Sequence, residues 1–170
     1  DESRRNDDTG ITHVHHFFPK KEVWGLAAIW SAIQRTSDKR VQCALRMPFT
    51  TMLLYCSFMR RFRADRRGGG PLSGTLYVSS VSTPLNPSKS YHRNSNSVLL
   101  AHRLLLGKGS FTGVTTTQSS TALPGIPDSS VDYIFVDPPF GGNLMYSELN
   151  FLWEAWLRVF TNNELEAIVN

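Results

Sequence analysis

Cysteine and long apolar runs are scarce in this 170-residue chain. Its two cysteines, Cys43 and Cys56, form no Cys-x-x-Cys pair and no disulfide framework, so we expect both to be buried free thiols in a reducing compartment. No run approaches the roughly 18 apolar residues that span a bilayer, and the polar start of the chain contains no signal-peptide core. The sequence therefore predicts a cytoplasmic protein.

An excess of charge of one sign is also missing. Lys and Arg number 18 against 14 for Asp and Glu, which gives a formal net charge of +4, and 41% of the residues are hydrophobic. These values are typical of one ordinary globular domain with a weak preference for polyanionic partners. They identify no partner by themselves.

The chain also lacks the Gly-x-x-x-x-Gly-Lys-Ser/Thr loop with which P-loop NTPases hold phosphates. This absence argues against interpreting residues 133–137 as the Mg²⁺-binding strand of such an enzyme. We find no internal repeat.

Helical periodicity is present in several segments. Apolar residues recur at spacings of three and four, which predicts helices over residues 23–33, 41–59, 98–106 and 149–160. Pro48 should kink or restart the second helix, and Gly107 should end the third. The tryptophans on these faces are expected in the core, at positions 24, 30, 153 and 156. Residues 1–10 show no such period and are expected to be a frayed end.

Three short segments have the composition of strands: residues 75–80, 111–117 and the β-branched and aromatic run 131–136. A turn cluster at 124–128 precedes the last of them. Strands that alternate with helices predict an α/β fold with a mostly parallel sheet flanked by helices. Ligands bind at the carboxyl ends of the strands in such sheets, which is where Asp137 falls.

The run 131–136 leads into Asp137-Pro138-Pro139-Phe140. These four residues alone are also compatible with a simple strand stop. Residues 129–140, however, resemble the strand and catalytic loop of S-adenosylmethionine-dependent amino-methyltransferases, whose signature is Asp, Asn or Ser followed by two prolines and an aromatic residue. Residues 141–153 and 12–18 are similar to large bacterial adenine-specific DNA methylases. The resemblance implies a Rossmann-like methyltransferase fold, with residues 11–170 as an incomplete part of one catalytic domain.

The chemistry explains this combination of residues. An exocyclic base amine is a poor nucleophile because its lone pair is delocalised into the ring, so acceptors around the amine must localise that pair. Asp137 would accept one N–H of the amine. The Pro138 carbonyl, which lies on a backbone that Pro139 helps to fix, would accept the other N–H. Phe140 would stack on a base extruded from the duplex, a contact worth about 1 to 3 kcal/mol.

The glycine-rich loop that holds the methyl donor in this family is missing. Gly68-Gly69-Gly70 follows arginines instead of a strand, and Gly107-Lys108-Gly109 precedes a predicted strand. We expect the loop in the remaining part of a parent methyltransferase, before residue 1, and expect the isolated chain to be inactive. Relatives commonly carry an acidic donor contact after the strand 111–117. Here the resemblance implies only Asp137 and Ser120 as contacts to S-adenosylmethionine.

Two further clusters have alternative interpretations. His13, His15 and His16 could suggest zinc, but no further ligand lies at a recognisable spacing, so we expect packing or substrate positioning and no metal. A basic run before the glycine corner is either a solvated helix end or a phosphate contact to double-stranded DNA. Its members are Arg60, Arg61, Arg63, Arg66 and Arg67.

The sequence thus predicts a DNA methyltransferase that transfers a methyl group from S-adenosylmethionine to an exocyclic base amine. In the family, Asp before the prolines favours adenine N6 over cytosine N4, and no Pro-Cys nucleophile for carbon methylation occurs. Methylation of RNA or of a protein glutamine is the alternative within enzymes. The alternative outside enzymes is a non-catalytic DNA-binding or restriction-accessory fragment.

Overall fold

The computed structural model is built from helices and loops. It describes residues 4–65, 69–72, 74–106, 113–116, 118, 122–137 and 146–161. Within these residues the elements follow in the order η1 Arg4–Thr9, η2 Val14–Phe17, α1 Lys20–Gln34, α2 Lys39–Met52, η3 Leu54–Cys56, α3 Pro87–Leu105 and α4 Tyr146–Leu157, where η denotes a 3-10 helix.

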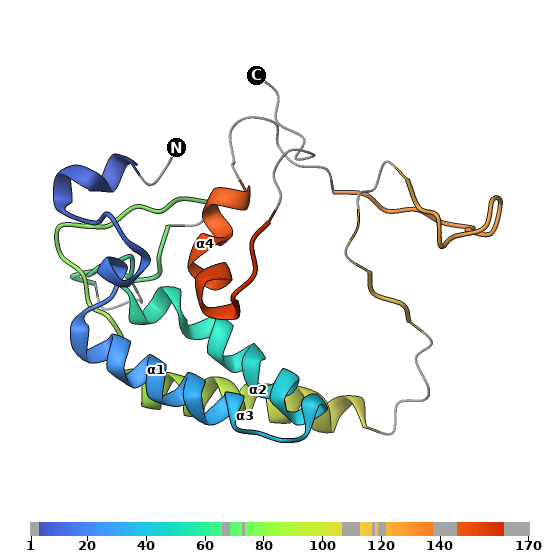
Figure 1. Cartoon of the computed structure of the whole chain (residues 1–170), viewed down its shortest axis with the longest axis horizontal. Helices are drawn as coiled ribbons and strands as arrows, with labels where there is room; N and C mark the ends of the chain where they lie inside the picture. The colour runs from blue at the N-terminus through green and yellow to red at the C-terminus, as the bar shows by residue number, and fades with distance from the viewer. Residues whose placement is uncertain are drawn as a thin grey trace.

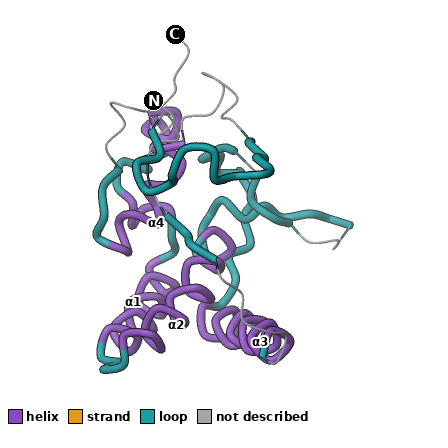
Figure 2. Tube along the Cα trace, turned by 90° about the vertical axis from the view of Figure 1, so that its right-hand side faces the viewer, coloured by secondary structure: helices purple, strands orange, loops and turns teal. Residues whose placement is uncertain are grey.

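Helices α1, α2 and α3 pack against one another and form the base of the molecule, with loops and α4 above them (Figures 1 and 2). Gly25 on α1 allows the close approach of α3, because a Cβ at this position would lie 3.2 Å from Cγ of Pro87. Leu26 and Ile33 on α1 and Phe49 on α2 are fully buried or nearly so. We call these three helices together with α4 the helical body.

Side-chain caps define where the helices begin and end. Asp38 accepts hydrogen bonds from the backbone N–H groups of Arg40 and Val41 at the start of α2, and Asn86 accepts one from Lys89 at the start of α3. The amide of the buried Gln42 donates to three carbonyls at the end of α1, those of Ile33, Gln34 and Thr36. These contacts satisfy backbone groups that a helix leaves without partners at its ends.

Pro48 lies inside α2, which continues through it to Met52. The predicted restart of the helix is therefore wrong. A proline removes one backbone donor from the helix interior, and polar side chains from α3 contact the backbone here. The Tyr91 hydroxyl donates to the Leu45 carbonyl at 3.1 Å, and the Asn94 amide donates to the Pro48 carbonyl at 3.5 Å.

Helix α4 joins the helical body through aromatic rings. Trp156 makes edge contacts with Phe49 and Trp30, at centroid distances of 5.3 and 6.4 Å. The Trp153 indole N–H donates to the Thr50 carbonyl at 2.9 Å. Leu152 is fully buried. The core thus joins residues from both ends of the sequence.

The predicted α/β fold with a Rossmann-like, mostly parallel sheet is wrong. The described residues contain no strand, and their isolated β-bridge pairs Arg61 with Ser82 in antiparallel orientation. A strand-forming sequence becomes a strand only when a neighbour takes up its backbone N–H and C=O groups. Residues 131–136 make no such ladder here, and Phe135 is 80% exposed. At 75–80, the buried Leu76 carbonyl instead accepts a hydrogen bond from Asn6.

The helices were predicted better, with some corrections. The third helix begins at Pro87, well before residue 98, and α4 begins at Tyr146 and ends at Leu157. Trp24 is 78% exposed and Cys43 is exposed, so the prediction that both are buried is wrong. The N-terminal residues that were expected to fray include η1, with Asn6 buried. None of the described helices is long and apolar enough to cross a membrane.

Candidate functional site

The carboxylate of Asp137 lies at the end of an exposed arm, which we define as residues 122–137. Figure 1 shows this arm, in orange, projecting away from the helices. Asp137 is exposed, and within the described residues its side chain has no hydrogen bond or ion pair. Pro138, Pro139 and Phe140 lie outside the described residues, as does Ser120.

Local turns shape the arm. The Ile126 N–H donates to the Leu123 carbonyl at 2.9 Å, which confirms the predicted turn cluster. The Ser130 hydroxyl donates to the Pro127 carbonyl at 2.7 Å, and Ser129 adopts a φ of 57°. These bonds span three residues each, so the arm is held by local contacts alone in the described region. Asp137 is consequently presented away from the core.

The basic corner, residues 60–70, uses its arginines internally. The Arg60 guanidinium donates to the Thr83 carbonyl and hydroxyl, and Arg61 Nε donates to the Gly70 carbonyl at 3.2 Å. Arg63 forms an ion pair with Asp65 at 2.6 Å between Nη2 and Oδ2. Arg66 and Arg67 lie outside the described residues. The DNA contact assigned to this run stays a prediction.

The corner turns sharply at Gly69. A Cβ added there would lie 1.6 Å from the backbone oxygen of Arg61, whereas a Cβ at Gly70 would meet nothing within 4 Å. Only glycine permits so close a backbone approach. Residues 71 and 72, which follow directly, line the cavity described next.

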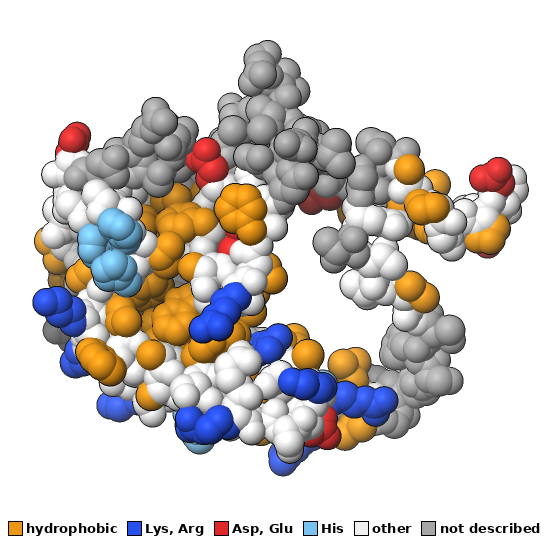
Figure 3. Space-filling view, in the orientation of Figure 1, with side chains coloured by type: hydrophobic (Ala, Val, Ile, Leu, Met, Phe, Trp, Pro, Cys, Tyr) orange, Lys and Arg blue, Asp and Glu red, His pale blue; other side chains and the backbone are white. Residues whose placement is uncertain are grey.

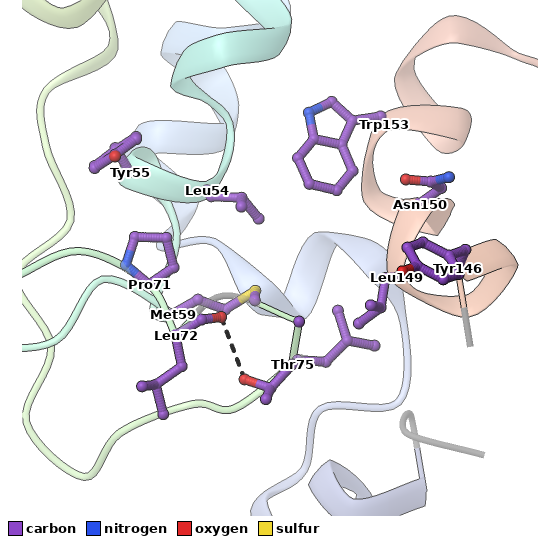
Figure 4. A pocket seen from close by; sticks show the side chains of 12 residues that line it. Leu54, Tyr55, Met59, Pro71, Leu72, Thr75, Tyr146, Leu149, Asn150 and Trp153 are labelled. Carbon is purple, nitrogen blue, oxygen red and sulfur yellow. Dashed lines mark hydrogen bonds between the residues drawn. The ribbon is translucent and has the colours of Figure 1, made fainter. Parts of the chain in front are cut away.

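A cavity of about 580 Å³ lies between η3, the loop 71–76 and the first turns of α4 (Figure 4). Its floor is apolar, with Leu54, Met59, Leu76 and Leu149. Tyr55 reaches it from η3, and Tyr146 and Trp153 reach it from α4. None of its lining residues is Lys, Arg, Asp or Glu. The volume lies within the range of pockets that hold small molecules.

The lining residues of α4 all belong to one side of the helix. They recur at positions i, i+3, i+4 and i+7, namely Tyr146, Leu149, Asn150 and Trp153. The bond from Trp153 to Thr50 holds the indole in place. Asn150 is exposed, and its side-chain amide has no hydrogen bond within the described residues. Among the described residues, nothing occupies its donor or its acceptor.

The three histidines gather at η2, with His13 at its start and His15 and His16 within it. Their ring centroids are 4.2 to 5.6 Å apart, and they form a group beside apolar side chains in Figure 3. The Thr12 N–H donates to His16 Nδ1 at 3.3 Å. In the described part of the chain no group of three or more His, Cys, Asp or Glu side chains is placed to hold a metal ion.

The strongest electrostatic perturbation lies in the core, away from Asp137. Burial raises the pKa of the Cys56 thiol from 9.0 to about 11; a hydrogen bond with Ser90 lowers it and the nearby charge of Glu22 raises it. Burial also raises the pKa of Tyr91, whose hydroxyl contacts α2. Burial is the largest cause of both shifts.

No family model, curated protein or solved structure matches this chain. The candidate site therefore depends on the residues themselves. Sequence reasoning identified Asp137 but missed the cavity, because its walls come from residues nearly a hundred positions apart. The one available signal was the spacing of Tyr146, Asn150 and Trp153 on a single helix face.

Proposed function

We propose that this chain is the base-handling part of a DNA amino-methyltransferase, with adenine N6 as the acceptor. The observation that supports this function is Asp137 itself. Its carboxylate is exposed at the end of the arm and has no partner within the described residues. It does not hold the arm together, because no hydrogen bond or ion pair within the described residues uses it. A free carboxylate beside Pro138 is available to accept an N–H of a substrate amine.

The acceptor chemistry follows from hydrogen-bond geometry. Asp137 accepts one proton of the exocyclic amine and the Pro138 carbonyl accepts the other, which directs the nitrogen lone pair out of the ring plane. Phe140 stacks on the base after extrusion from the duplex. S-adenosylmethionine, the co-substrate of the family, supplies the electrophilic methyl group.

The described residues do not form a donor site of the family's kind, because no strand among them leads into a glycine-rich loop. We assign donor binding to the remaining part of a parent methyltransferase. The isolated 170-residue chain is then expected to show no binding of S-adenosylmethionine at micromolar concentration in calorimetry. Tight one-to-one binding would place the donor site in this chain instead.

Double-stranded DNA is the partner in this proposal, and the basic corner would add affinity that is independent of base sequence. Arg60 and Arg61 are poor positions for a test because they hold the corner together. A variant with Gln at positions 63, 66 and 67 should instead show a flatter dependence of DNA affinity on salt. An unchanged dependence of DNA affinity on salt would mean that these residues are only a solvated surface.

The decisive experiment for the catalytic role compares two aspartates of the same arm in the parent enzyme. Asp137→Ala removes the acceptor and should lower turnover about 10²- to 10³-fold, the usual effect of losing one transition-state hydrogen bond. Asp132→Ala removes an exposed carboxylate five positions earlier and should leave turnover unchanged. Equal activity in both variants would contradict the proposal.

The helical fold favours a second candidate function, a non-catalytic DNA-binding fragment, because the sheet on which these methyltransferases are built is absent from the described residues. Product analysis separates the candidates. DNA, RNA and a glutamine-containing protein are each offered to the parent enzyme with labelled donor. Label on adenine N6 supports the first proposal. Binding of DNA without label in any substrate supports the second.

A further inference from the structure

We propose that the cavity at the start of α4 binds a neutral planar heteroaromatic ring, specifically a purine base. This purine site is separate from the acceptor site at Asp137, and it does not depend on the proposed function. The walls, charge and polar groups of the cavity each restrict the ligand.

The walls favour a flat aromatic ligand. Tyr55 lines the cavity from η3, and Tyr146 and Trp153 line it from α4 (Figure 4). Trp153 is fixed by its bond to Thr50, so this ring surface is already ordered before a ligand arrives. Stacking of a base on a protein aromatic ring contributes about 1 to 3 kcal/mol.

The charge of the cavity excludes ionic ligands. Leucine and methionine side chains contribute much of its lining, and none of the described residues that line it is charged. A phosphate or carboxylate group would lose its hydration there without gaining a counter-charge. The ring of a nucleoside fits, with any phosphate left outside, on the side where Arg61 contacts the loop that leads to Pro71.

The polar groups distinguish a purine from a plain hydrocarbon. The Asn150 side chain offers an N–H donor and a carbonyl acceptor side by side, and neither is engaged within the described residues. This pair matches N7 and the N6 amine of adenine, the usual bidentate partner of Asn. Thr75 is less available, because its hydroxyl donates to the Leu72 carbonyl.

The test is a titration of the 170-residue chain with adenosine, in which binding is measured by calorimetry and by NMR. Asn150→Leu should weaken adenosine binding about 10-fold, as expected for a lost bidentate contact. Tyr146→Ala should weaken it similarly by removing one ring. The matched controls are Asn96→Leu, an exposed asparagine of α3, and Tyr77→Ala, an exposed tyrosine outside this cavity. Both should bind adenosine as the unaltered chain does.

Indole is the second probe. It is flat and aromatic, but it cannot form hydrogen bonds with the Asn150 carbonyl and the Asn150 N–H at the same time. It should bind more weakly than adenosine and respond to Tyr146→Ala but not to Asn150→Leu. No adenosine binding at millimolar concentration, or equal effects of Asn150→Leu and Asn96→Leu, would overturn the proposal.

The two proposals fail separately. Asp137→Ala should leave adenosine binding unchanged in the isolated chain, since Asp137 does not line the cavity. If adenosine binds but the parent enzyme transfers no methyl group, the catalytic proposal falls and the purine site stands. If methyl transfer depends on Asp137 but adenosine does not bind, the purine proposal falls and the catalytic proposal stands.

Discussion

The helical body and the arm contain similar apolar side chains, which are buried in the body and exposed in the arm. Phe49 in α2 is fully buried, whereas Phe135 in the arm is 80% exposed. A helix satisfies its own backbone hydrogen bonds and presents one apolar face, so it needs only a packing partner. A strand needs a neighbour for its backbone as well. The same composition therefore produces a core in one region and an exposed segment in the other.

Core truncation should show the largest difference between the regions. Phe49→Ala removes a fully buried ring that contacts Trp30 and Trp156, and it should lower the free energy of unfolding by about 3 to 5 kcal/mol. Phe135→Ala should change it by less than about 0.5 kcal/mol, as at other exposed sites. Chemical denaturation of both variants measures the two values. Similar losses would mean that the arm is part of the core.

The buried thiol should make the stability of the body depend on alkaline pH. The folded pKa of Cys56 is raised to about 11 from 9.0, so its contribution is fully present below pH 9 and is lost as the pH rises through 11. The loss over this window is about 2 to 3 kcal/mol. The free energy of unfolding should fall more steeply between pH 8 and pH 11 for the unaltered chain than for the Cys56→Ala variant. Parallel curves would contradict the assigned burial.

Gly69 and Gly70, two neighbouring glycines of the basic corner, differ in the space around them. Gly69→Ala places a methyl group against the Arg61 backbone and should cost about 1 to 3 kcal/mol, whereas Gly70→Ala enters open space and should cost less than that. Thermal unfolding of the pair gives the difference. If both variants melt together, the close approach at Gly69 is not part of the folded state.

Helix capping should give the smallest effect. Asp38→Ala removes the acceptor for two backbone N–H groups of α2 and should destabilise the body by about 1 kcal/mol. Asp128→Ala, an exposed aspartate of the arm, should leave the unfolding midpoint unchanged. A shift of the same size in both would show that the arm is coupled to the body.

The helices could be predicted because their information is local. Val23, Leu26 and Ile33 share one face by spacing alone, and α1 forms as that spacing indicates. Pro48 misled the prediction for α2, since contacts from Tyr91 and Asn94 on α3 meet the backbone around the proline. Such contacts join residues more than forty positions apart, and no local pattern encodes them.

The strands were predicted wrongly for a related reason. Residues 131–136 have a strong strand composition, but composition does not supply a partner, and the described residues contain none. For the site, the motif at Asp137 could be recognised because it is contiguous. The cavity could not, because Tyr55, Leu76 and Trp153 come together only after α4 packs on the helical body.

Hydrogen exchange of the backbone amides in the 170-residue chain tests most directly whether Asp137 is presented outside a self-sufficient helical body. Amides inside α1, α2 and α3 should exchange slowly, at rates set by global unfolding. Amides of residues 131–136 should exchange at rates close to those of an unstructured peptide. Protection of 131–136 equal to that of α2 would contradict the account, because it would require a strand partner or burial that the helical body does not provide.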